Sequence, residues 1–361
     1  GIYIAIGSSV IMIALLMNIR PILDVLKLDT HTAHITQGYL DAFAWGVPAM
    51  MLMMALRGLT DGLGHTKVIM AFSVLGTLIN LPLNYIFIYG KLGVPAMGGI
   101  GCGWATSISN GVAALAMFLY LNRSAAYRQF HLLQDWVKPD PETIKTILRL
   151  GVPIGFTIFI EASMFCIIAL FLAPLGPVTV AGHQIALNVV SLFFMVPLSL
   201  GLALTLRISF LVGARATDTA QLLARTILLL ALAIALVFGS VLFFGSNLIA
   251  HLYTGDEAVQ EVSRALLLYA AIFQIADVTQ VTCISALRGY KDTRIPMFIM
   301  LFSFWGVGLP LGWILAFTER IVPVMGAAGF WVGLTVGLTV AGLLLGARLY
   351  RFPATHPDVA P

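Results

Sequence analysis

Ten long apolar runs occupy most of this 361-residue sequence. Each run has the patterning of a helix, and a helix needs about 20 apolar residues to cross a hydrocarbon core roughly 30 Å thick. Only 10% of the residues are charged, compared with about 25% in soluble proteins. The sequence therefore predicts an all-α integral membrane protein, not an enzyme and not a nucleic-acid-binding protein.

One sustained polar stretch separates the runs into two groups. We expect an N-terminal lobe over 1–122, a linker over 123–144, a C-terminal lobe over 145–350 and a tail over 351–361. The predicted spans are 2–25, 37–57, 67–89, 99–121, 145–173, 178–206, 222–249, 262–286, 295–317 and 327–349.

The positive charges are distributed unevenly over the connections between these spans. Fifteen of the 20 Lys and Arg residues fall on one side of the predicted membrane and five on the other. Cytoplasmic loops carry the excess of Lys and Arg in most membrane proteins. We therefore expect the linker and the C-terminus to be cytoplasmic.

Four short motifs occur twice in the same order, which indicates a tandem duplication. The pairs are LRG at 56–58 and 287–289, TKVIM at 66–70 and TRIPM at 293–297, LPL at 81–83 and 309–311, and VPAMGGIG at 94–101 and VPVMGAAG at 322–329.

The offset between the last pair, 228 residues, sets the expected size of one repeat. The second half holds six spans, and the first four spans of the chain match its last four. The sequence thus predicts twelve spans in two six-helix bundles, related by a pseudo-two-fold axis along the membrane normal, with ten of the twelve present here. With a repeat of this length, two further spans of about 80 residues in total are expected to lie before Gly1.

Two acidic residues, Glu161 and Asp277, lie in the middle of predicted spans. Each costs about 2.5–3.5 kcal/mol at a bilayer centre, so such residues normally face a protein interior or a water-filled cavity. Gln274 and Gln280 extend a polar stripe on either side of Asp277, and Thr157 precedes Glu161 by one turn. With no basic residue at the same depth, the pair predicts a Na⁺ or H⁺ site. The alternative is two buried protonated acids that serve structure alone.

Asn80 and Asn84 form a second polar group deep in a predicted span. Their spacing places both amides on one helix face, where Thr106 of the next span is expected to join them. The set predicts a second site completed by an acid in the missing helices, so we expect the 361-residue chain alone not to transport. The alternative is that the amides only hold helices together.

The chain resembles the multidrug and toxic compound extrusion (MATE) family, in its NorM-like branch. The resembling stretches are LRGLTDGLGHTK, LINLPLNYIFIYGKLGVPAMGGIGCGWATSIS, GVPIGFTIFIEASMFCIIALFLAPLG, AGHQIALN and QIADVTQVTCISALRGYKDT. The resemblance implies two six-helix lobes that export cationic, amphipathic drugs in exchange for Na⁺ or H⁺. It also implies a monomer in the bacterial inner membrane with no cofactor besides the coupling ion.

The resemblance also assigns roles to residues. Glu161 and Asp277 match the family's acidic cation site, with Phe273 where relatives can place a Tyr. Gln184, Phe273, Gln274 and Gln280 are expected to line the substrate cavity, and Asn80, Asn84 and Thr106 match positions around the N-terminal lobe's Asp. A lipid-precursor flippase of the same superfamily and an inactive or scaffolding paralogue are the alternative functions.

Overall fold

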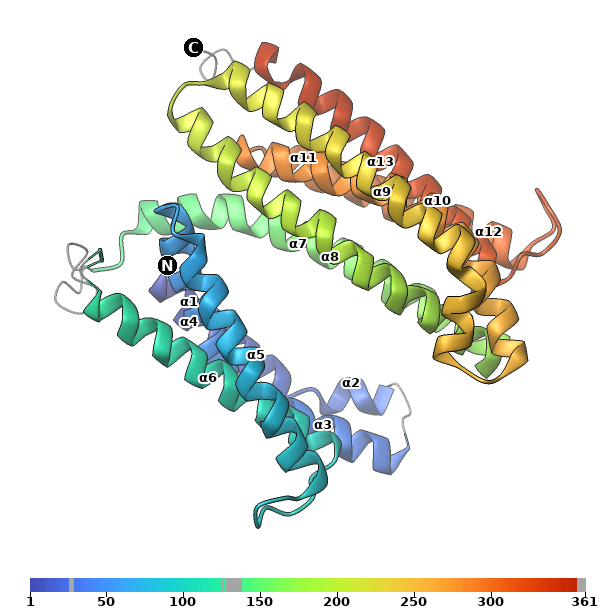
Figure 1. The fold of residues 1–361 in the computed structure, drawn as a ribbon, viewed down its shortest axis with the longest axis horizontal. Coiled ribbons are helices and arrows are strands. Elements are labelled where there is room, and N and C mark those ends of the chain that lie inside the picture. Colours follow the sequence, from blue (N-terminus) through green and yellow to red (C-terminus); the bar gives the residue numbers. More distant parts are fainter. Residues whose placement is uncertain (26–28, 125, 128–137, 356–361) are drawn as a thin grey trace. The chain divides into compact units, whose positions relative to one another are not determined.

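The computed structural model describes residues 1–25, 29–124, 126–127 and 138–355 (Figure 1). All regular elements in these ranges are helices. The chain forms two compact units, Gly1–Ile144 and Lys145–Pro361, and each is described by itself.

The first unit is built around α6, which packs against α3, α4 and α5. Its helices are α1 (Ile2–Met17), α2 (Arg20–Val25), α3 (Thr30–Ala44), α4 (Val47–Gly62), α5 (Thr66–Tyr89) and α6 (Gly99–Arg123).

Two predicted spans of this unit differ from the observed helices. The run 2–25 is divided into α1 and α2, with a break at residues 18–19. The run 37–57 begins earlier, as α3, and is bent by 46° before α4. Pro48 follows the bend and has no N–H group to continue the helical hydrogen bonds of α3.

A hydroxyl from α6 satisfies the backbone at this bend. Ser107 Oγ donates to the carbonyl oxygen of Ala42 at 2.7 Å. Gly46 fits beside it because a Cβ there would lie 2.7 Å from Ser107 Cα. The bend is therefore a packed feature of the α3–α4–α6 contact.

The second unit surrounds α10, which packs against α8, α9 and α13. Its helices are α7 (Pro141–Leu172), the short η2 (Ala173–Leu175), α8 (Pro177–Gly213), α9 (Thr217–Tyr253), α10 (Glu257–Gly289), α11 (Arg294–Leu301), η3 (Phe302–Gly308), α12 (Leu309–Phe317) and α13 (Ala327–Thr355). The predicted span 295–317 is thus α11 and α12 joined by the π-helical turn η3, just before Pro310.

Eight helices of the described residues are long and apolar enough to cross a membrane, and the bent pair α3–α4 makes a ninth span. The chain is therefore a multi-pass membrane protein. The apolar run predicted as the first span contains α1 and α2, with a break at residues 18–19.

The repeated loops have the same backbone geometry in both units. The Met97 N–H donates to Phe87 O at 2.9 Å, and the Met325 N–H donates to Leu315 O at 3.0 Å, in each case ten residues back. Gly98 and Gly326 follow with φ of 54° and 55°, a region that favours glycine. The structural match supports duplication of this segment.

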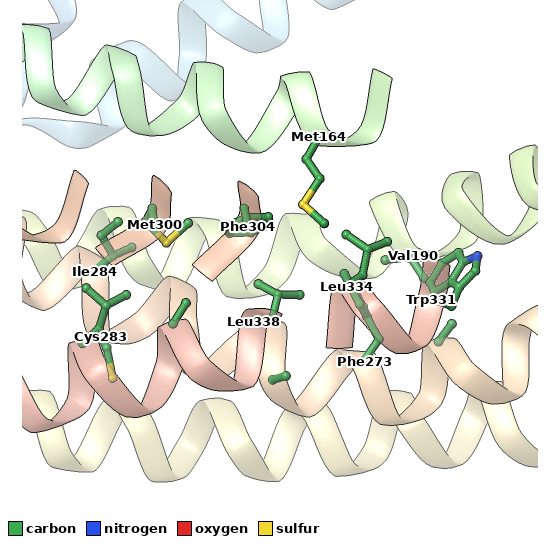
Figure 2. Packing of buried hydrophobic residues seen from close by; sticks show 14 of the residues in the cluster. Met164, Val190, Phe273, Cys283, Ile284, Met300, Phe304, Trp331, Leu334 and Leu338 are labelled. Atoms are coloured by element: carbon green, nitrogen blue, oxygen red, sulfur yellow. The ribbon is translucent and has the colours of Figure 1, made fainter. Parts of the chain in front are cut away.

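Large side chains from several helices fill the core of the second unit (Figure 2). Phe273 of α10 lies against Trp331 of α13, with ring centroids 5.5 Å apart. Met164 extends from α7 toward Leu334, and both are fully buried (Figure 2). This packing encloses the face of α10 that carries its polar residues.

Candidate functional site

A polar stripe on α10 is enclosed within the second unit. Gln274, Asp277 and Gln280 follow one another at three-residue intervals, and their exposed fractions are 0%, 3% and 1%. Helix α10 packs on three sides, so this face has neighbouring helices in place of lipid. The stripe expected from the sequence therefore lies in a protein interior, where each polar atom needs a partner.

Most polar atoms of the stripe have no hydrogen-bond partner within the described residues. These are both amide atoms of Gln274, Oδ2 of Asp277 and Oε1 of Gln280. Gln280 Nε2 reaches only the thioether sulfur of Met300, at 3.2 Å. A buried polar atom without a partner costs about 1–3 kcal/mol, so such a group points to a ligand.

Two hydroxyl oxygens are also buried without a partner among the described residues. They are Ser303 Oγ, from η3, and Thr282 Oγ1, which lies on a different face of α10 from the stripe. Ser303 lies one turn after Met300, the residue that Gln280 contacts. Carboxylate, amide and hydroxyl oxygens are the donors that hard cations prefer, so the chemistry fits Na⁺. No group of three or more His, Cys, Asp or Glu side chains suited to a metal occurs in the described part of the chain.

Glu161 lies half-buried on α7, within electrostatic range of Asp277. It is also within range of Arg288, near the end of α10. Asp277 and Arg288 are eleven residues apart, about 16 Å along the helix axis. Arg288 therefore influences Glu161 electrostatically from the end of α10, an influence that sequence position alone did not predict.

The remaining residues of this predicted site fall into two environments. Phe273 is 2% exposed and packs on Trp331, so it belongs to the core together with its neighbour Gln274. Gln184 of α8 is exposed. The residue before it, His183, is 1% exposed and accepts a hydrogen bond from Trp331 Nε1 at 3.3 Å. Sequence reasoning missed His183, although its place beside Gln184 in AGHQIALN was a signal.

In the first unit, hydrogen bonds connect the amide pair to α6. Asn84 Nδ2 donates to Asn80 Oδ1 at 2.7 Å, and Asn80 Nδ2 donates to Ser109 Oγ at 3.2 Å. Thr106 instead donates to the Cys102 carbonyl of its own helix at 2.8 Å. The Thr106 hydroxyl thus donates to the backbone of its own helix and not to the amides, whereas Ser109 accepts from Asn80.

Asn80, Thr106 and Ser109 nevertheless line one cavity of about 340 Å³ within the first unit. Its other wall carries Met50, Met53, Met54 and Phe72 of α4 and α5. Ligand pockets commonly measure about 300–1,000 Å³, and flexible methionines suit surfaces that accept varied ligands. The cavity therefore combines an amide-lined polar side with an adaptable apolar side.

Comparison with known proteins identifies the family. The MatE family model matches residues 1–86 and 153–314, which include Asn80, Asn84, Glu161 and Asp277. The chain belongs to the MatE family. It is 42% identical over 356 residues to a probable multidrug resistance protein NorM of Shewanella oneidensis, covering 99% of this chain and 77% of that protein.

Two further relatives of this MatE chain agree. A multidrug resistance protein MdtK of Edwardsiella ictaluri is 40% identical, covering 97% of this chain and 77% of its own length. The solved outward-facing structure of a multidrug resistance MATE family transporter of the MOP superfamily superposes with a TM-score of 0.87 at 18% identity. That alignment covers 98% of this chain and 77% of the other, and it shows the shared fold.

Proposed function

We propose that this chain is a secondary active multidrug exporter, which moves cationic, amphipathic drugs out of the cell in exchange for Na⁺ or H⁺. The observation that carries the proposal is the enclosed set of oxygen atoms without partners around Asp277. The relatives named above as multidrug resistance proteins support the export of drugs.

The proposed coupling chemistry follows from the burial of Asp277. An ionised carboxylate in this enclosed position is costly unless something neutralises it. Na⁺ would do so through the carboxylate with the oxygens of Gln274, Gln280 and Ser303, and H⁺ would do so by protonating Asp277. A conformation that encloses this group is therefore favoured when the cation is bound, and a change of conformation releases it.

Glu161 has a different part in the proposal. Arg288 lies within electrostatic range of Glu161, and neither Glu161 nor Asp277 forms an ion pair among the described residues. Because Asp277 is more deeply buried than Glu161, we infer that Asp277 is the carboxyl that binds the exchangeable cation. Glu161 adds negative potential near it, because the two carboxyls lie within electrostatic range. The two residues act together, with Asp277 as the binding group.

The amide-lined cavity of the first unit is the proposed drug contact. Amide oxygens of Asn80 and Asn110 can face the cationic group of a drug, while Met50 and Phe72 contact its apolar part. We propose alternating access between the two lobes in the bacterial inner membrane. The C-terminus is proposed to be cytoplasmic, on the side of the fifteen positive residues.

The test is ethidium efflux from cells that express the gene product carrying this chain. Glu161→Gln and Asp277→Asn should each abolish efflux driven by a cation gradient, because an amide keeps the volume but cannot exchange a cation. Glu261→Gln is the matched control, since Glu261 is an exposed acid on the same helix. Normal gradient-driven efflux by both site variants, at wild-type protein levels, contradicts the assignment.

A further inference from the structure

A groove opens between α9 and α13, near the end of each helix that is expected to face the cytoplasm. It has a volume of about 160 Å³, and Cys283 of α10 lies at its floor. Figure 2 shows the Cys283 sulfur turned away from Ile284. Gly346 of α13 lies opposite Cys283, and a Cβ there would be 3.8 Å from Cys283 Sγ, an ordinary contact distance.

One end of this groove is cationic. Arg225 is exposed, and its guanidinium lies 5.9 Å from the centre of the Tyr350 ring. Gln221 precedes Arg225 by one helical turn and lines the same groove. No acid is among the lining residues, and within the described residues Arg225 forms no ion pair. By contrast, Arg348 of the neighbouring helix α13 forms an ion pair with Asp292 at 3.0 Å.

Farther along the same helices lies a second, largely apolar hollow, which we call the apolar channel. This hollow, of about 250 Å³, runs between α10 and α13 and includes Thr279 and Gly342. Thr279 precedes Cys283 by four residues, and Gly342 precedes Gly346 by four, so both hollows follow the same helix faces. The threonine hydroxyls that line this second hollow donate hydrogen bonds to the backbone of their own helices. Thr279 Oγ1, for example, donates to Ile275 O at 2.7 Å.

The length of the combined groove is that of one acyl chain. From Ile272 to Cys283, α10 rises about 16 Å. Half of a hydrocarbon core is about 15 Å thick. Arg225 and Tyr350 then lie at the level of lipid headgroups, where guanidinium groups bind phosphate and tyrosine is enriched. Free phosphate would leave the apolar channel unexplained.

We propose that this groove binds one anionic phospholipid of the cytoplasmic leaflet. Its phosphate lies at Arg225, with Gln221 and Tyr350 as further donors, and one acyl chain lies between α10 and α13. The site is separate from the Asp277 cluster, so this proposal does not depend on the proposed transport function. It makes the second unit sensitive to the lipid composition of its membrane.

Native mass spectrometry of the full chain in mild detergent tests this proposal. The probes are dioleoyl phosphatidylglycerol and dioleoyl phosphatidylcholine, which share their acyl chains and differ in headgroup charge. The wild type should retain the anionic lipid preferentially, and Arg225→Gln should reduce that preference roughly fivefold or more. Arg149→Gln removes the same charge from an exposed position of α7 and should leave the preference unchanged.

A second pair of variants tests the groove itself. Gly346→Leu should exclude the lipid by filling the space above Cys283, whereas Gly346→Ala should retain it. Equal retention of both lipids by the wild type, or equal losses in Arg225→Gln and Arg149→Gln, overturns the proposal. Displacement of the anionic lipid by inorganic phosphate alone also overturns it in favour of a free-phosphate site. If Gly346→Leu does not fold, the arginine pair decides the question.

Discussion

Replacing Asp277 by leucine should stabilise the protein. The two side chains branch at the same atom, so leucine replaces both carboxyl oxygens with methyl groups at little change in shape. Asp277 is 3% exposed and its Oδ2 has no partner among the described residues. Removing one such atom recovers about 1–3 kcal/mol, and replacing a buried charged group by an apolar one of similar volume often gains a similar amount.

For a unit of this size, each kcal/mol corresponds to about 2–4 °C in melting temperature. Asp277→Leu should therefore melt about 2–12 °C above the wild type, while losing cation-driven efflux. The fluorescence of the fully buried Trp331, in the same unit, is a suitable reporter. Higher stability without activity is the pattern expected when a site retains a costly group for function.

The matched control is the same substitution at the start of the same helix. Asp256 accepts hydrogen bonds from the N–H groups of Ala258 and Val259, at 2.9 and 3.4 Å. Asp256→Leu removes this cap and should cost about 1 kcal/mol, which lowers the melting temperature. If Asp277→Leu also melts below the wild type, the carboxyl is satisfied in the folded protein and the argument from unpaired oxygens is refuted.

Three further predictions follow from other parts of the chain. Gly329→Ala should cost about 1–3 kcal/mol in a melting experiment, since its Cβ would lie 2.6 Å from Ala316 N; Gly155→Ala meets nothing within 4 Å and should not destabilise. In a background without native cysteines, a cysteine at Lys91 should react with an impermeant maleimide from outside and one at Arg215 only from the cytoplasm; the reverse pattern would overturn the proposed orientation. Hydrogen bonds from Thr143 and the backbone lower the pKa of the exposed Asp140 below its ordinary value of 3.8. Its contribution to stability is thus present above pH 3.8 and lost as the pH falls through the lower folded pKa, so Asp140→Asn should flatten stability-versus-pH curves in that acidic range.

Much of the fold follows from the sequence because apolar run length decides whether a helix can span the membrane. The predicted runs 67–89 and 99–121 correspond closely to α5 and α6. The bend between α3 and α4 was not predictable, because it depends on a hydroxyl that Ser107 brings from a distant helix. Run length is a local property, whereas this bend is a tertiary contact.

The candidate site shows the same limit. Helical spacing alone placed Gln274, Asp277 and Gln280 on one face of α10. It could not predict that Ser303 of the π-helical turn is buried without a partner, or that Arg288 influences Glu161, because both depend on how separate helices pack. Spacing also could not predict that the Thr106 hydroxyl donates to the backbone of its own helix.

In the proposed function, cation binding at Asp277 is coupled to drug export. The most direct measurement follows ethidium release and cation entry together in vesicles that carry the gene product of this chain, under an imposed Na⁺ or H⁺ gradient. One of these cations should enter as ethidium leaves, and Asp277→Asn should stop both fluxes although the protein remains folded. Ethidium export by Asp277→Asn with wild-type dependence on the gradient would contradict it.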